Sequence, residues 1–235
     1  MSKTLYQIEP PAPPRTWHMY RAMVGIGLAC GLLIVTVYRL TLPIIERNKA
    51  EALERAIFQV LPQAQSSAVF RFVDDEYFER VDGSGGRAGS DGGAQVVYAG
   101  YDDERQLVGL AVEAQGMGYQ DVIRVLYGYS FADEAVIGVQ VLESRETPGL
   151  GDKIETDPQF LENFRRLDVS LTGDGAQIAR PIEAVKRGDK QHAWQIDGIT
   201  GATISSVAIA DILRDSTAWW VPRIRRRLDD FGEGN

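Results

Sequence analysis

The stretch "DGITGATISS", residues 197–206, combines a turn signal with the start of an amphipathic helix. If Thr200 is the N-cap, its hydroxyl accepts a backbone N–H of the first turn, and Thr203 is the third helical position. Gly201 and Ala202 then add no bulk to that turn. Unpaired amides and the helix dipole make such a start an anion site. A plain threonine cap, with small residues for close packing, explains the same pattern, so both interpretations are open.

The helix that follows is predicted to run from about Ala202 to Thr217. Its buried face is expected to comprise Ile204, Val207, Ala208 and Ile212. Residues 219–235 begin with two tryptophans and a short basic run, and we expect them to form a C-terminal tail.

Residues 95–145 contain four runs with strand character, separated by short turn signals such as "YDDER" and "SFADE". Connections this short exclude parallel crossovers and predict an antiparallel meander. One or two more strands are expected within 68–81. A helix should start at Asp157–Pro158, and two or three short strands should follow it, "HAWQI" being the last. The predicted fold class is α+β, a mainly antiparallel sheet with flanking helices.

An N-terminal apolar segment, "AMVGIGLACGLLIVTVY", covers residues 22–38 without a charge and lies between Arg21 and Arg39. Its length is at the short end of the range for a spanning helix, roughly 17–25 residues, and apolar residues continue to Ile45. A cleaved signal peptide is the alternative, but no small-x-small cleavage site follows the run. We therefore expect an N-terminal tail over 1–21 and one transmembrane anchor over 22–45.

The segment 46–93 is expected to hold a membrane-proximal helix, strands and a glycine-rich loop. A helical pattern covers 45–61 and stops at Pro62. The loop "DGSGGRAGSDGG", residues 82–93, formally contains the dinucleotide fingerprint G-x-G-x-x-A. That fingerprint requires a helix to begin there, whereas more glycines follow, so we interpret it as a loop or insertion.

Composition limits the chemistry available to the chain. One cysteine and two histidines exclude an intrachain disulfide and a zinc site built from Cys and His. The net charge of −8 argues against nucleic-acid binding, which needs clustered basic residues. No side chain is expected to act as a catalyst or metal ligand, so any chemistry must come from a bound group.

A second motif, "ETPGLGDKI", covers residues 146–154. Its segment Thr147-Pro148-Gly149-Leu150 predicts a type II turn, because proline fixes φ at the second position and glycine supplies positive φ at the third. An isolated turn of this kind is also compatible with a purely structural role.

The segment Asp197–Thr203 resembles the D-x-x-[ST]-G-A-[ST] signature of FMN-binding domains. In that family a flavin transferase uses FAD and Mg²⁺ to attach FMN by a phosphoester to the last threonine. The resemblance implies that Thr203 is the attachment site. The surrounding recognition sequence would be Asp197, Gly198, Thr200, Gly201 and Ala202, where Gly198 replaces an alanine often found in the family.

The upstream motif resembles the E-T-P-G-L-G segment of the RnfG family, the G subunits of Rnf electron transport complexes. It is also similar to the related C subunit of the sodium-pumping NADH:quinone reductase. Together with the anchor and the chain size, the two motifs in this order extend the resemblance over nearly the whole chain. The flavin contacts that it implies are Glu146, Thr147, Gly149 and Leu150.

The resemblance implies a single-pass protein of the bacterial inner membrane, with an FMN-binding domain over 94–218 on the periplasmic side. Such a subunit relays electrons through covalent FMN and does not catalyse turnover alone. Its partners would be the other subunits of a complex that couples ferredoxin and NAD⁺ redox chemistry to ion movement, and the flavin transferase. Two alternatives are the C subunit of the quinone reductase and an anchored scaffold without a cofactor.

Overall fold

The computed structural model describes residues 16–81 and 95–232. The tail up to residue 15 and the glycine-rich loop predicted at 82–93 lie outside the described residues. By its internal contacts the chain divides into two compact units, Met1–Ala50 and Glu51–Asn235. The apolar stretch belongs to the first unit and the sheet to the second.

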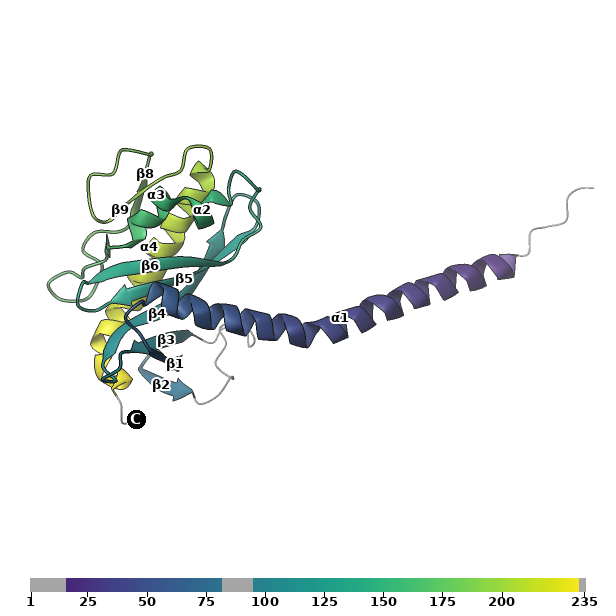
Figure 1. Ribbon diagram of the computed structural model, residues 1–235, viewed down its shortest axis with the longest axis horizontal. Helices are drawn as coiled ribbons and strands as arrows, with labels where there is room; N and C mark the ends of the chain where they lie inside the picture. Colours follow the sequence, from purple (N-terminus) through teal and green to yellow (C-terminus); the bar gives the residue numbers. More distant parts are fainter. Residues whose placement is uncertain (1–15, 82–94, 233–235) are drawn as a thin grey trace, which may run out of the picture. The chain divides into compact units, whose positions relative to one another are not determined.

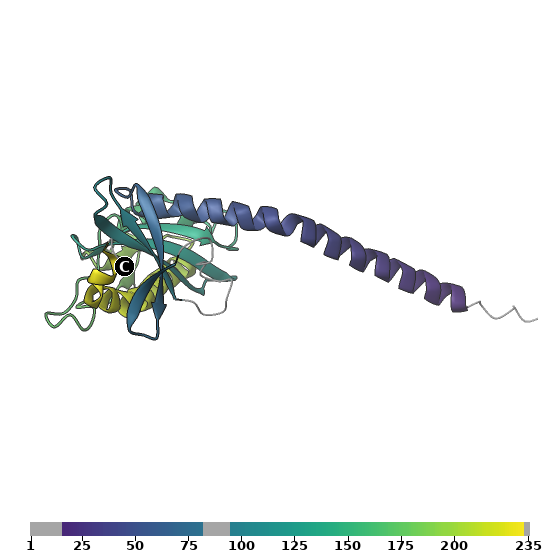
Figure 2. The same cartoon turned by 90° about the horizontal axis from the view of Figure 1, so that it is seen from below.

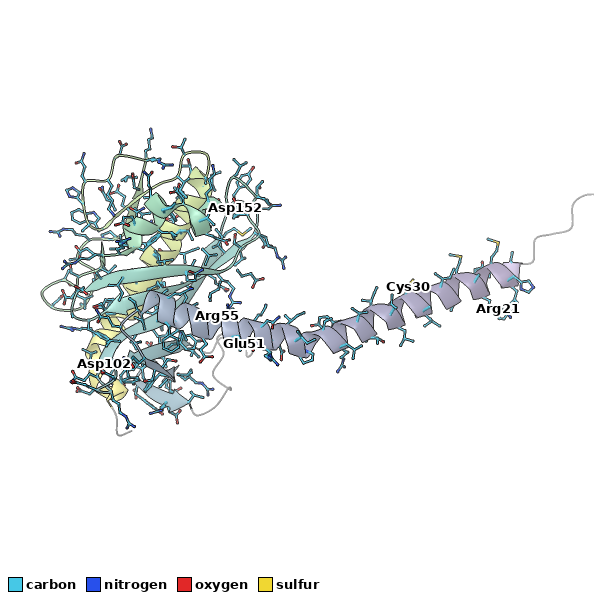
Figure 3. The ribbon with its side chains drawn as sticks, viewed as in Figure 1. Arg21, Cys30, Glu51, Arg55, Asp102 and Asp152 are labelled. Atoms are coloured by element: carbon cyan, nitrogen blue, oxygen red, sulfur yellow. The ribbon has the colours of Figure 1, made fainter. Side chains whose placement is uncertain are left out.

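Helix α1 (Thr16–Val60) opens the described chain (Figure 1). A window of 18 residues in it has a mean hydropathy of 2.0, and α1 is the one described helix with the length and composition to cross a membrane. Cys30 lies in the exposed apolar stretch (Figure 3). The helix predicted at 45–61 is the C-terminal part of α1, which continues through Pro43. No glycine between 39 and 45 provides a helix stop, so one helix forms instead of two.

The second unit contains a seven-stranded sheet in the order β2-β1-β3-β4-β5-β6-β7, with antiparallel pairing throughout. Strands β3 to β6 form the predicted meander, and the α+β fold class is confirmed. The strands are β1 (Ser66–Val73), β2 (Tyr77–Val81), β3 (Val96–Tyr101), β4 (Leu107–Met117), β5 (Val122–Ser130), β6 (Ala135–Glu143) and β7 (Leu167–Asp168).

The central strands are buried on both faces. Leu110 and Tyr127 belong to a large core cluster on the face covered by helix α4 (Thr203–Arg226). Their neighbours Ala111 and Leu126 belong to a second cluster, on the face covered by the last turns of α1. Alternate residues of a strand point to opposite faces, so the doubly buried stretches 109–112 of β4 and 125–129 of β5 contain no charged residue. The sheet is therefore the middle of three layers (Figure 1 and Figure 2).

The end of α1 lies directly on the main chain of the sheet. A Cβ atom on Gly138 would lie 2.9 Å from the Cα of Val60, and one on Gly128 would overlap the Val60 carbonyl oxygen. On Gly100 it would lie 2.8 Å from the side chain of Leu61. Glycine at these positions allows a helix-to-sheet approach that other residues would block.

Short elements connect β6 to the last helix. They are α2 (Lys153–Thr156), α3 (Pro158–Leu161), η1 (Glu162–Phe164) and the parallel pair β8 (Glu183–Val185) and β9 (Gln195–Asp197). The predicted helix start at Asp157 is confirmed, because its carboxylate accepts hydrogen bonds from the amides of Gln159 and Phe160 at 2.9 and 3.3 Å.

The C-terminal segment belongs to the core. The sequence predicts that helix α4 ends near Thr217, with a tail after it, but the helix runs to Arg226 and is followed by η2 (Leu228–Phe231). The ring of Phe231 is fully buried and packs on Phe70 and Phe78, with ring centroids 5.0 and 4.7 Å apart. The predicted helix end is wrong because these aromatic contacts, made with distant strands, outweigh the polar character of the local sequence.

The glycine contacts lead to a stability prediction. Gly128→Ala should lower the free energy of unfolding by about 1–3 kcal/mol, because the added methyl group cannot fit beside Val60. The control is Gly173→Ala, where nothing lies within 4 Å, and its change should stay within about 0.5 kcal/mol. Thermal unfolding of the full chain in detergent measures both. Equal melting temperatures would contradict the packing described here.

Candidate functional site

The two sequence motifs form similar reverse turns. In the first, the amide of Leu150 donates to the carbonyl of Thr147 at 3.1 Å, and Gly149 has φ of 77°. This matches the turn predicted from the proline and glycine. In the second, the Ala202 amide donates to the Ile199 carbonyl at 3.0 Å and Gly201 has φ of 85°. No atom lies within 4 Å of a Cβ built on either glycine, so the backbone conformation alone requires them.

The start of α4 differs from the prediction. The helix begins at Thr203 and is preceded by Ala202 with no side-chain cap, so Thr200 is not the N-cap and Thr203 is the first helical residue. Positive φ at Gly201 makes a complete turn before the helix and leaves Thr200 exposed. Ser206 stabilises this start instead: its hydroxyl accepts from the Ile199 amide at 3.0 Å and donates to the Ala202 carbonyl at 2.8 Å.

The exposed first turn of α4 presents a hydroxyl and unpaired amides. Amides at the start of a helix have no acceptor inside the helix, and here the residues concerned are Thr203, Ile204 and Ser205. Within 16–81 and 95–232, the Thr203 hydroxyl has no hydrogen-bond partner. The positive end of the dipole of this 24-residue helix adds to the attraction for an anion.

Both motifs line one cavity of about 380 Å³. This volume lies in the usual range for small-molecule sites, about 300–1,000 Å³. Two other hollows of the described chain, of about 450 and 600 Å³, contain no residue of either motif. The lining residues are Tyr119, Glu146, Thr147, Leu150, Gly151, Gly201, Ala202, Thr203, Ile204 and Ser205.

Large apolar side chains are exposed around this cavity. Tyr119, Leu150 and Ile204 line it and are 65%, 50% and 57% exposed. Ile204 and Val207 were predicted to be buried, which is wrong, whereas Ala208 and Ile212 are buried as predicted. Ser205 and Ser206 form the buried side of the first turn of α4, so Ile204 lies on its outer side and faces the cavity. An apolar wall beside an anion-binding helix start fits a ligand with a flat ring and a phosphate.

Glu146 is a buried carboxylate in the cavity wall, only 6% exposed. Desolvation pushes its pKa upward. Hydrogen bonds from the Gln120 amide at 3.0 Å and the Ser205 hydroxyl at 2.5 Å act in the opposite direction. Their combined effect prevails and the pKa of Glu146 lies below its ordinary value, so the group is ionised at neutral pH.

Some of the predicted site residues do not line the cavity. The Asp197 carboxylate accepts the Gly188 amide at 2.7 and 2.9 Å, and the Asp197 main chain bonds twice to the buried Asn163 side chain at 3.0 Å. The Gly198 amide donates to Val185 at 3.0 Å. Thr200 and Gly149 do not line the cavity either. Asp197 and Gly198 therefore fix the backbone that leads into the turn at 199–202.

Sequence comparisons bear on the same segment. Residues 118–218 match the FMN-binding domain, a range that includes every residue lining the cavity. The G subunit of the ion-translocating oxidoreductase complex of Methanosarcina acetivorans is 33% identical over 198 residues, 83% of this chain and 88% of the relative. The corresponding protein of Shewanella piezotolerans is 30% identical over 218 residues, 86% and 91% of the two chains. This chain belongs to the family of G subunits of ion-translocating oxidoreductase complexes.

Solved structures with a similar fold come from another complex. Shewanella oneidensis NqrC aligns with a TM-score of 0.57 and 16% identity, over 79% of this chain and 98% of that one. The C subunit of the Na⁺-translocating NADH-quinone reductase from Parabacteroides distasonis gives 0.55 and 17%, over 80% and 96%. At such identities the similarity establishes the fold alone. This member of the G-subunit family therefore shares an architecture with these C subunits.

The sequence did not indicate that Tyr119, Gln120 and Ser205 contribute to this cavity or its wall. The β4–β5 turn, residues 118–121, places Tyr119 in the cavity wall, and the backbone amide of Gln120 donates to Glu146 at 3.0 Å. The Gln120 side chain also accepts the Thr147 hydroxyl at 3.2 Å. Ser205 has the sequence context of an ordinary helical residue. In the local sequence "GMGYQ", residues 116–120, only Gly118 indicated that the turn packs closely against another segment.

The roles of Ser206 and Thr200 at the start of α4 can be tested by measuring stability. Ser206→Ala should destabilise the protein by about 1–3 kcal/mol, because the buried Ile199 amide loses its acceptor. Thr200→Ala, at an exposed position, should change the free energy of unfolding by less than about 0.5 kcal/mol. Thermal unfolding of both variants measures the difference. The opposite ranking would restore Thr200 as the cap.

Proposed function

We propose that this chain is the FMN-carrying electron-relay subunit of an ion-translocating oxidoreductase complex of the Rnf type, with FMN attached through a phosphoester to Thr203. One observation carries the proposal: motifs that are separate in sequence meet at a single cavity, with the Thr203 hydroxyl at its helix start. The match of residues 118–218 to the FMN-binding domain supports the identity of the ligand.

The structure offers a physical reason to choose Thr203 among neighbouring hydroxyls. Ser205 and Ser206 are buried and donate their protons to Glu146 and to the Ala202 carbonyl. Thr200 is exposed but does not line the cavity. Thr203 is exposed, lines the cavity and keeps its hydroxyl without a partner among the described residues. It is therefore the hydroxyl best placed to react.

The attachment reaction needs no catalytic group from this chain. The Thr203 oxygen would attack the phosphorus of the FMN half of FAD, forming a phosphoester and breaking the pyrophosphate bond. AMP leaves, and the hydroxyl proton passes to a base of the flavin transferase. The amides and dipole at the start of α4 stabilise the phosphate that remains. Bound FMN then supplies the electron-transfer chemistry.

The apolar wall would hold the ring system of the cofactor. Leu150 and Ile204 come from the two motifs and Tyr119 from the β4–β5 turn, and all three line the cavity. These exposed side chains would be covered by the flat ring, which would remove apolar surface from water. In the same wall, Glu146 and Thr147 supply polar groups, and Gly151 supplies main chain without a side chain.

The relatives are named as subunits of an ion-translocating oxidoreductase complex, which supports other subunits of such a complex as partners. We infer that electrons move through the FMN between these subunits while the complex couples ferredoxin and NAD⁺ redox chemistry to ion movement. Helix α1 would anchor the protein in the bacterial inner membrane, with the folded unit on the periplasmic side.

Covalent attachment is tested by denaturing electrophoresis with in-gel flavin fluorescence, after co-expression with a flavin transferase. The wild-type band should fluoresce, Thr203→Ala should be dark, and Thr200→Ala should still fluoresce because it keeps the Thr203 hydroxyl. Mass spectrometry should place the FMN adduct on the peptide containing Thr203. A dark wild-type band, or fluorescence that survives in Thr203→Ala, would refute the assignment.

Topology is tested by cysteine labelling in a Cys30→Ser background. Asp103 is exposed in the β3–β4 turn, next to Asp102, which lies at the far end of the unit from Asp152 (Figure 3). In spheroplasts, Asp103→Cys should react with a membrane-impermeant maleimide, while Ser2→Cys should react only after the membrane is broken. The reverse pattern would place the folded unit in the cytoplasm.

A further inference from the structure

Glu146 connects three segments that are separate in sequence. It begins the 146–151 motif, its Oε1 accepts the Gln120 amide of the β4–β5 turn at 3.0 Å, and its Oε2 accepts the Ser205 hydroxyl of α4 at 2.5 Å. Ser205 is 2% exposed, so the Glu146–Ser205 bond is shielded from water. In the described part of the chain, no lysine, arginine or histidine forms an ion pair with Glu146.

Two glycines fix the position of the carboxylate. A Cβ on Gly118 would lie 2.5 Å from Glu146 Oε1, and a Cβ on Gly151 would lie 2.6 Å from Oε2 and 2.9 Å from the Ser205 hydroxyl. Neither glycine has positive φ, so space and not backbone conformation requires the absence of a side chain. The main chain thus closes on both carboxylate oxygens and leaves them little freedom to move.

The direction of the hydrogen bonds follows from the ionised carboxylate, which can only accept. The single proton of the Ser205 hydroxyl is donated to Glu146, and this bond holds the first turn of α4 beside the 147–151 turn. Thr203 is two residues earlier on the same turn. The distance between the Thr203 hydroxyl and the wall around Leu150 therefore depends on the bond between Glu146 and Ser205.

We propose that Glu146 is a positioning residue for the FMN site: through Ser205 and Gln120 it sets the place of Thr203 against the 147–151 turn. The inference rests on the proposed function, since it assigns Glu146 a role toward the same cofactor. Because the carboxylate lines the cavity without a basic partner among the described residues, its negative charge also disfavours the reduced, anionic flavin and lowers the reduction potential.

Two variants separate the effect of the Glu146–Ser205 hydrogen bond from the effect of the negative charge of Glu146. Glu146→Gln keeps the shape and removes the charge, and its amide group can donate to Ser205 so that the contact survives with reversed polarity. Ser205→Ala breaks the contact to α4 and keeps the charge. The matched control is Glu143→Gln, a half-exposed acid three residues earlier that pairs with Arg124 at 3.5 Å and does not line the cavity.

The experiment uses the full chain in detergent and measures the rate of FMN attachment, the midpoint potential of the attached flavin and amide hydrogen exchange before attachment. Ser205→Ala should slow attachment at least about tenfold, as expected when a reacting group is displaced. Glu146→Gln should shift the midpoint potential to more positive values, which a merely structural role would not do. Glu143→Gln should match the wild type in all three measurements.

Hydrogen exchange keeps this inference separable from the proposed function. In Ser205→Ala, amides of residues 118–121 and 203–206 should exchange faster than in the control, whether or not FMN is attached. If the wild type attaches no FMN at Thr203, the proposed function fails, and the exchange rates still decide whether Glu146 joins the segments. Exchange or an attachment rate in Ser205→Ala equal to the control, or a midpoint potential in Glu146→Gln equal to the wild type, would overturn the proposal.

Discussion

The burial of the central sheet on both faces is the constraint on which the rest of the structure depends. Leu110 and Tyr127 point into one core cluster, and Ala111 and Leu126 into another. A sheet with two apolar faces needs a cover on each side. Helix α4 supplies one cover and the last turns of α1 the other, so the end of the long N-terminal helix is itself part of the core of the folded unit.

The same packing explains why α4 can be both structural and functional. One face of its middle and last turns is buried: Ile209, Leu213 and Ile224 are almost inaccessible, and Phe231 beyond them closes the aromatic cluster. In its first turn only one side is buried, by Ser205 and Ser206, and Ile204 on the other side is more than half exposed. A helix held firmly along its length can present its N-terminal amides in a fixed direction, which is a suitable arrangement for binding an anion.

The polar residues of the "GATISS" segment have separate tasks. Ser206 bonds the turn to the helix, Ser205 bonds the helix to Glu146, and Thr203 is left at the cavity. The helical repeat contributes to this separation, since residues one or two positions apart, such as Ser205 and Ser206 or Thr203 and Ser205, point in different directions. The hydroxyls that stabilise the site are thus chemically distinct from the one proposed to carry the cofactor.

Features that depend on neighbouring residues were predictable from the sequence: the apolar run of α1, the meander of β3 to β6, the Asp157 helix start and the positive φ of Gly149. The motifs also indicated the family, because their side chains are specific in type and order. Tertiary structure decided where α4 begins and ends, that Ile204 is exposed, and that Glu146 meets Ser205, 59 residues away. Such features depend on contacts between segments distant in sequence, whose strength no local pattern records.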